Sequence, residues 1–206
     1  MVALSEIQTD ALIEILNISN GRAAAALSRM VKAPIRLSVP SLQLIPAGRA
    51  GRLLMGAISD GDQICGISQT FSGPFQTEAV LMFPKVRSLE IVGMWMDEPM
   101  PVEELAELEV ETLAELGNVL LYAYFGSIAK LLNSSFKSNL PTVRFGTADE
   151  MLTGHAIPDA ESILLTYVDF TIATQRIQGY IAFLMSRTSI DLLLECVEHF
   201  MDESTP

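Results

Sequence analysis

The spacing of apolar residues changes along the chain, and each change marks a boundary between predicted elements. From residue 6 to residue 17 apolar positions recur with a helical period, and the Ala-rich stretch 22–32 resumes that period. Ser5 is a suitable N-cap for the first stretch, and Asn20-Gly21 interrupts the pattern between the two. We therefore predict two helical segments with a bend or short break between them.

A strand period of two follows the helices of the first half. Residues 35–39 alternate in this way, and Pro40 is expected to stop or bend the strand. Asp60-Gly61 is typical of a hairpin turn and lies between two further candidates. The remaining predictions for this half are strands at 42–45, 52–58 and 63–71 and helices at 75–83 and 86–96.

The same plan begins again after Pro99 and Pro101, two prolines that make a continuous helix unfavourable. Residues 145–162 contain glycine and proline and are predicted as a loop. The other predictions are helical segments at 103–118 and 122–132, strands at 162–174 and 176–185, and a closing helix at 189–201.

A polar helix face occurs once in each half, with every position displaced by 101 residues. Asp10, Glu14 and Asn17 are repeated as Glu111, Glu115 and Asn118, and Pro40 is repeated as Pro141. The fold class that we predict is α+β, with pseudo-twofold duplicated helix-helix-strands-helix halves that share one β-sheet covered by helices. The chain is expected to be a single domain, 1–206, made of two internal repeats, 1–100 and 101–206.

Composition excludes several classes of function. A net charge of −12 disfavours nucleic acid and anionic lipid as partners, because those ligands are bound by clustered Lys and Arg. No apolar run approaches the roughly 18 residues of a membrane span, and the N-terminus has no secretory pattern, so a cytoplasmic location is expected. Cys65 and Cys196 fit two reduced, buried thiols better than a disulfide, which stays the minor alternative.

An acidic face on one amphipathic helix is most often solvated surface. Two copies in register need another explanation, because asparagine is a poor helix former compared with Glu, Lys or Ala. The pattern also includes a proline 23 positions after each asparagine, since 17 + 23 = 40 and 118 + 23 = 141. The repeated face is therefore a candidate functional surface.

This pattern resembles the signature of the CheC, CheX and FliY phosphatases of bacterial chemotaxis, and the resemblance extends over the whole chain. The first copy matches the signature at all four positions, whereas the second has Glu111 where Asp or Ser is usual. The family usually has a glycine before the asparagine, which is expected to let the helix approach its partner closely. Gly117 keeps it, and Leu16 replaces it in the first copy.

The resemblance implies hydrolysis of the aspartyl-phosphate on a CheY-like response regulator. Asn17 and Asn118 would orient the attacking water, as an amide side chain does in small GTPases. Glu14 and Glu115 would pair with the lysine of the regulator's active site. Asp10 and Glu111 would make accessory contacts. The Mg²⁺ ion is expected on the regulator, with no cofactor of the chain's own, and CheD is a further possible partner.

Alternative chemistries have weaker support. His155 and His199 lack the spacing of metal ligands, and no glycine-rich phosphate loop or nucleophile elbow is present. Carboxylates at i and i+4 would hold a divalent ion only weakly. Trp95 is either a partner-binding anchor or, more simply, packs between the halves. The second hypothesis for function is a non-catalytic adaptor that binds a phosphorylated response regulator, as flagellar switch proteins do.

Overall fold

The computed structural model describes residues 4–31, 34–57, 63–96, 100–152, 162–172 and 175–204. Its elements, in chain order, are α1 (Glu6–Val31), β1 (Ile35–Pro46), α2 (Ala47–Ala57), β2 (Ile64–Ser72), β3 (Gln76–Pro84), the 3₁₀-helix η1 (Lys85–Arg87), α3 (Ser88–Trp95), α4 (Val102–Leu131), β4 (Lys137–Ser138), β5 (Thr142–Gly146), α5 (Ala148–Leu152), β6 (Ser162–Ile172), β7 (Gln175–Met185) and α6 (Arg187–Ser204).

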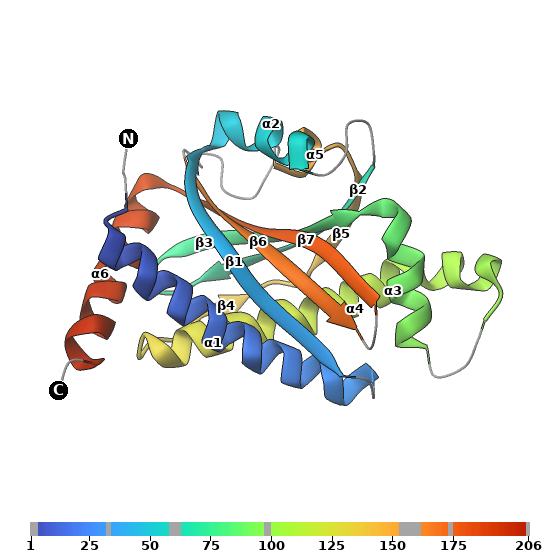
Figure 1. The fold of residues 1–206 in the computed structure, drawn as a ribbon, viewed down its shortest axis with the longest axis horizontal. Coiled ribbons are helices and arrows are strands. Elements are labelled where there is room, and N and C mark those ends of the chain that lie inside the picture. Colours follow the sequence, from blue (N-terminus) through green and yellow to red (C-terminus); the bar gives the residue numbers. More distant parts are fainter. Residues whose placement is uncertain are drawn as a thin grey trace.

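One antiparallel sheet forms the centre of the molecule, in the order β1-β6-β7-β3-β2, with β4 and β5 both pairing with the outer side of β2. Helices α1 and α4 lie side by side against one face, and α2 and α5 cover the other (Figure 1). A large apolar core fills the space under α1, α3, α4 and α6, and a smaller core fills the space under α2 and α5. The predicted α+β class, one shared sheet covered by helices, is confirmed.

The element order on the two sides of residue 101 is the same. Exchanging β1 with β5, β2 with β6 and β3 with β7 reverses the strand order and leaves the sheet unchanged, so a pseudo-twofold axis passes between β3 and β7. Each half runs helix, strand, helix, two strands, helix. The division into repeats 1–100 and 101–206 stays a prediction about domain organisation.

The long helices are continuous where a break was predicted. Helix α1 has 26 residues and passes through Asn20-Gly21 without interruption, and α4 has 30 residues. Packing of α1 along α4 outweighs the low helix propensity of that dipeptide. The predicted N-cap is confirmed, because Ser5 Oγ accepts a hydrogen bond from Gln8 N–H at 3.2 Å and Gln8 Oε1 accepts one from Ser5 N–H at 3.0 Å.

Two predicted elements have the opposite type. Residues 52–57, predicted within a strand, belong to α2, where Ala50, Gly51 and Leu54 are buried at a helical spacing. Residues 75–83, predicted as a helix, form most of β3. This strand is central and buried on both faces, so its sequence is a continuous apolar run without alternation. The predicted hairpin at Asp60-Gly61 lies outside the described residues, and β2 pairs with β3 in its place.

Other predictions differ only in detail. Strand β1 continues through Pro40, and its register with β6 shifts between Ser38 and Ser41, so the proline bends the strand without ending it. The predicted loop 145–162 contains α5. The strands at 63–71, 162–174 and 176–185, the helical stretch at 86–96 and the closing helix are confirmed within a few residues at their ends. Cys65 and Cys196 are both free thiols.

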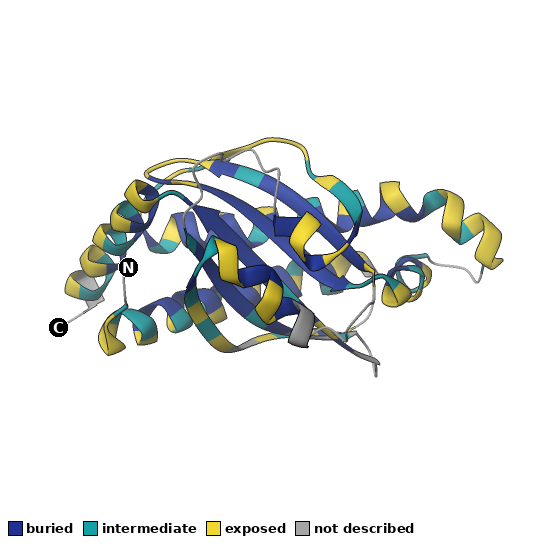
Figure 2. Ribbon diagram, turned by 90° about the horizontal axis from the view of Figure 1, so that it is seen from above, coloured by how far each residue is buried: buried dark blue, intermediate teal, exposed yellow. Residues whose placement is uncertain are grey.

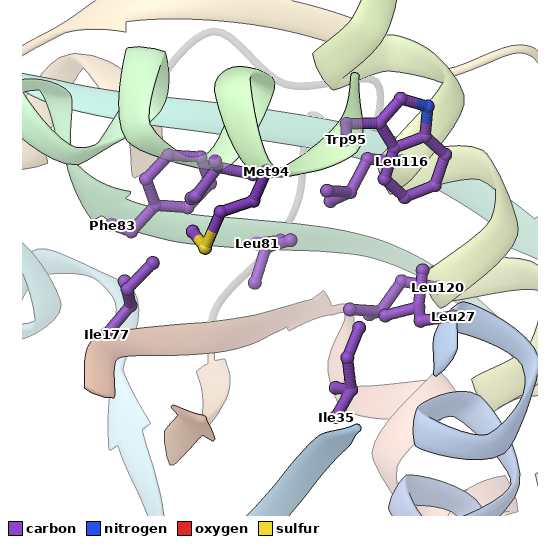
Figure 3. A pocket seen from close by; sticks show the side chains of 10 residues that line it. Leu27, Ile35, Leu81, Phe83, Met94, Trp95, Leu116, Leu120 and Ile177 are labelled. Carbon is purple, nitrogen blue, oxygen red and sulfur yellow. The ribbon is translucent and has the colours of Figure 1, made fainter. Parts of the chain in front are cut away.

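Trp95 lies at the junction of the two halves, where packing was the simpler prediction. Its indole lines an apolar pocket together with Leu27 of α1 and Leu116 and Leu120 of α4 (Figure 3). A buried polar contact fixes α3 nearby: Glu109 of α4 accepts hydrogen bonds from Lys85 Nζ and Ser88 Oγ. Trp95 therefore packs between the halves.

Burial follows the layers. The strands are dark blue along most of their length in Figure 2, whereas the helices have exposed outer faces. No helix among the described residues is long and apolar enough to cross a membrane. The exposed outer faces of α1 and α4 carry the repeated polar positions.

Candidate functional site

The two polar faces lie where the sequence places them, on the outer sides of the paired helices. On α1, Asp10, Glu14 and Asn17 are exposed. On α4, Glu111 and Glu115 are exposed, and Asn118 is half-buried. The helices contact each other along their inner sides, where Arg22 Nη1 donates a hydrogen bond to Ser127 Oγ at 3.0 Å. Both faces are therefore accessible to a partner protein.

Asn118 is held by a residue that the sequence pattern did not indicate. Gln69 of β2 has an exposed fraction of only 1%, and its side chain points toward α4. Gln69 Nε2 donates one hydrogen bond to Asn118 Oδ1 at 3.2 Å and another to the carbonyl oxygen of Asn139 at 2.8 Å. The amide of Asn118 thus has a partner in the sheet below it.

The proline of the motif accounts for the position of Asn139. Strands β4 and β5 both pair with β2, and the chain between them, residues 139–141, ends in Pro141, which has no N–H for the ladder. Asn139 stays attached to β2, because its Oδ1 accepts from Thr70 N–H at 2.8 Å and its N–H donates to Thr70 O at 3.3 Å. Its own carbonyl is then placed to accept from Gln69. In the second copy, the break between β4 and β5 therefore places Asn139 within reach of Gln69, below α4.

The first copy has no counterpart of Gln69. Thr142, which follows Pro141, pairs with Ser68, and Ser41, which follows Pro40, pairs with Tyr167. Gln69 follows Ser68 on β2, and Val168 follows Tyr167 on β6, so Gln69 and Val168 occupy corresponding positions in the two halves. Val168 is fully buried in the apolar core and has no hydrogen-bonding side chain. The two sites therefore differ beneath the asparagine as well as on the helix.

Gly117 faces the sheet and not a partner. A Cβ atom at this position would overlap Cγ2 of Ile67 and lie 3.3 Å from its Cβ. The expectation that this glycine lets a partner approach is therefore wrong; it lets α4 lie close to β2, which brings Asn118 within reach of Gln69. Leu16, at the corresponding place on α1, is buried in the core.

Additional exposed groups extend the second face. Tyr122 lies one turn after Asn118 on the same side of α4 and is 64% exposed. A shallow hollow beside it is lined by the rings of Phe71, Phe125 and Phe136. Gly21 takes the place of Tyr122 in the first copy. No group of three or more potential metal ligands occurs among the described residues.

The fold and the faces define the class of structure. The chain has the fold of the CheC, CheX and FliY proteins, an antiparallel sheet with two long helices side by side on one face.

Particular solved structures agree with this assignment. FliY from Thermotoga maritima matches with a TM-score of 0.77 and 19% identity, covering 98% of this chain and 99% of that chain. The FliM middle domain from H. pylori matches with a TM-score of 0.60 and 12% identity, covering 94% and 99%. CheX from Desulfovibrio desulfuricans matches with a TM-score of 0.52 and 14% identity, covering 84% and 100%. No protein-family model matches the sequence.

Proposed function

We propose that this protein hydrolyses the aspartyl-phosphate of a CheY-like response regulator, with the better-organised site on α4. The observation that carries this proposal is the amide of Asn118, which is held by Gln69 one turn from the exposed carboxylate of Glu115. An amide that is fixed in position beside an exposed docking carboxylate suits a reaction that depends on the placement of a water molecule.

The reaction needs no reactant beyond water. The water oxygen forms a bond to phosphorus while the bond between phosphorus and the aspartyl oxygen breaks. The electron pair of the broken bond stays on the regulator's carboxylate. The water oxygen becomes part of the released phosphate and keeps one of its protons, and the other proton passes to another phosphate oxygen. The amide of Asn118 would hold the water in line with the breaking bond without adding negative charge beside the phosphoryl group.

Glu115 would dock the regulator. Its carboxylate is exposed on the same side of α4 as Asn118, less than one turn before it. An ion pair with the lysine of the regulator's active site would fix the position of the helix along the partner. Glu111 and Tyr122 lie one turn beyond on either side and would widen the contact. The Mg²⁺ ion would belong to the regulator, so no metal ligand is assigned to this chain.

The first copy would bind the phosphorylated regulator in the same way, through Glu14 and Asn17, with Asp10 as the accessory contact. Val168 gives Asn17 no buried amide of the kind that Gln69 gives Asn118. Because Gln69 has no counterpart in the first copy, we expect the second copy to account for most of the hydrolysis.

A second candidate function is a non-catalytic adaptor that binds the phosphorylated regulator and leaves the phosphate intact. The fold alone does not decide between the two functions, because the FliM middle domain shares it over 94% of this chain. CheD is a further candidate partner, for which no contact surface is assigned.

Phosphate release separates the two functions. A CheY-type receiver domain is phosphorylated with a small-molecule phosphodonor in the presence of Mg²⁺, and loss of the aspartyl-phosphate is followed with and without the protein. Acceleration that disappears in the Asn17→Ala plus Asn118→Ala variant supports the phosphatase. Binding with an unchanged phosphate lifetime supports the adaptor.

A further inference from the structure

The hydrogen bonds of Gln69 fix the orientation of two side-chain amides. The carbonyl of Asn139 can only accept, so the end of Gln69 that faces it must be the NH₂ group. The second hydrogen of that group is directed at Asn118, and the atom of Asn118 that receives it must be Oδ1. Nδ2 of Asn118 is then at the far end of its amide, and the second lone pair of Oδ1 stays free of Gln69.

Gln69 is an unfavourable residue for its surroundings. Its neighbours on the same side of β2 are Ile67 and Phe71, which are 0% and 1% exposed in the apolar core. Gln69 Oε1 is buried and has no hydrogen-bond partner among the described residues. A buried acceptor without a partner lowers stability, whereas an apolar side chain would incur no such cost. Val168, at the corresponding position of β6, is such a side chain.

We propose that Gln69 is a positioning residue that sets the plane and the direction of the Asn118 amide for catalysis. This inference rests on the proposed phosphatase function. Because Gln69 holds the inner end of the amide, Asn118 presents Nδ2 and one lone pair of Oδ1 at fixed positions to the phosphoryl group and the water. The unpaired Oε1 lowers the stability of the fold, whereas the benefit of Gln69 lies in the rate, because a fixed Asn118 amide needs no reorganisation when the regulator docks.

The two sites differ in the strand residue that lies beneath the asparagine. Asn17 and Asn118 occupy equivalent helix positions. The corresponding strand residue is Val168 in the first copy and Gln69 in the second, and Gln69 donates a hydrogen bond to Asn118. Replacement of Gln69 is therefore expected to lower the rate of hydrolysis at the second site, whereas replacement of Val168 by another apolar residue is expected to leave the rate at the first site unchanged.

Kinetics of single variants test this role. Gln69→Met keeps the length of the side chain and removes both hydrogen bonds. It is expected to lower kcat for the phosphorylated receiver by between about 10- and 100-fold, with KM unchanged, because docking through Glu115 is intact. Gln178→Met, at an exposed glutamine of β7, is the matched control and is expected to change neither constant. A rise in KM with unchanged kcat would overturn the proposal.

A double-mutant cycle separates positioning from a general structural effect. In the Asn118→Ala background, Gln69→Met is expected to have no further effect on kcat, because the group that it positions is gone. An equal loss of kcat in both backgrounds would contradict positioning.

The pH profile of Gln69→Glu gives a readout that packing alone would not move. The ionised carboxylate would repel the Asn139 carbonyl and Asn118 Oδ1, whereas the protonated acid can donate one hydrogen bond. The kcat of this variant relative to wild type is expected to rise as pH falls. A ratio that is constant with pH contradicts the proposal.

The order of the Asn118 side chain can be measured without turnover. The side-chain ¹⁵N order parameter of Asn118 is measured by NMR in the free protein, and it is expected to be high in wild type and to fall in Gln69→Met, with Gln178→Met unchanged. If the protein proves inactive, this result alone decides whether Gln69 positions Asn118. Equal order in wild type and Gln69→Met would overturn the positioning role whatever the activity.

Discussion

The side chains of Gln69 and Asn118, 49 positions apart in the chain, are joined by a hydrogen bond of 3.2 Å between β2 and α4. This contact connects the helix that carries the polar face to the sheet beneath it. It depends on two further features of the second half, the close approach of α4 at Gly117 and the strand break at Pro141. In the second copy, the interval between Asn118 and Pro141 is thus linked to a contact within the protein itself.

Gly117→Ala tests the close approach of α4 to β2. The added Cβ would overlap Ile67, which is fully buried and would have to shift within a packed core, so the free energy of unfolding is expected to fall by about 1–3 kcal/mol. Gly126→Ala, on the same helix, is the control: no atom lies within 4 Å of a Cβ there, and the change is expected to raise stability by about 0.5–1 kcal/mol. Chemical denaturation measures both. Equal effects would mean that helix propensity, and not contact with Ile67, determines the result.

Asn20→Leu is expected to stabilise the protein. Both polar atoms of the Asn20 side chain are buried and have no hydrogen-bond partner among the described residues, and Leu121 occupies the corresponding position of α4, since 20 + 101 = 121. Removing the unpaired amide should raise the free energy of unfolding by about 1 kcal/mol. Asn20→Asp, which buries a charge, should lower it. A loss of stability in Asn20→Leu would show that the amide is satisfied in solution.

Stability is expected to fall at alkaline pH because of Cys65. Burial, with a smaller contribution from Glu109, raises the pKa of the Cys65 thiol from 9.0 to about 12. The folded state therefore holds this proton more tightly than the unfolded state between those values. Its contribution to stability is complete below pH 9.0 and is lost as pH rises toward about 12, with a slope of up to ~1.4 kcal/mol per pH unit.

Comparison of Cys65→Ala with wild type isolates that contribution. The variant is expected to be less stable at neutral pH because it leaves a cavity, so the slopes are compared and not the absolute values. Its stability should decline less steeply above pH 9.0. Burial also raises the pKa of Tyr124, which leaves a residual decline in both proteins. Identical slopes would contradict the assignment to Cys65.

Glu115→Gln tests docking separately from chemistry. Loss of the exposed carboxylate is expected to raise KM for the phosphorylated regulator several-fold, equivalent to about 1 kcal/mol, with kcat retained. The effect should shrink at high ionic strength because salt screens an exposed ion pair. Glu104→Gln, in the exposed first turn of α4, is the matched control. An equal rise in KM for both variants would assign the effect to overall charge.

Sequence patterns predicted the polar faces, the shared sheet and the Ser5 cap, because each depends on local periodicity or on capping chemistry. They did not predict β3 or α2, since burial on both faces removes the alternation of a strand and the Gly-rich α2 buries only a narrow stripe around Ala50 and Leu54. Gln69 has no local signal: it is one of several polar residues of β2, next to Ser68 and Thr70, and nothing in the strand sequence singles it out. Its partner is determined by the tertiary fold, which no local pattern contains.

The separate replacement of the two asparagines tests the central claim most directly. Hydrolysis of the aspartyl-phosphate on a CheY-type receiver is measured with Asn118→Ala and with Asn17→Ala, each at saturating regulator. Asn118→Ala is expected to remove most of the acceleration, on the order of 100-fold at its own site, and Asn17→Ala is expected to leave most of it in place. Full activity in Asn118→Ala would contradict the account.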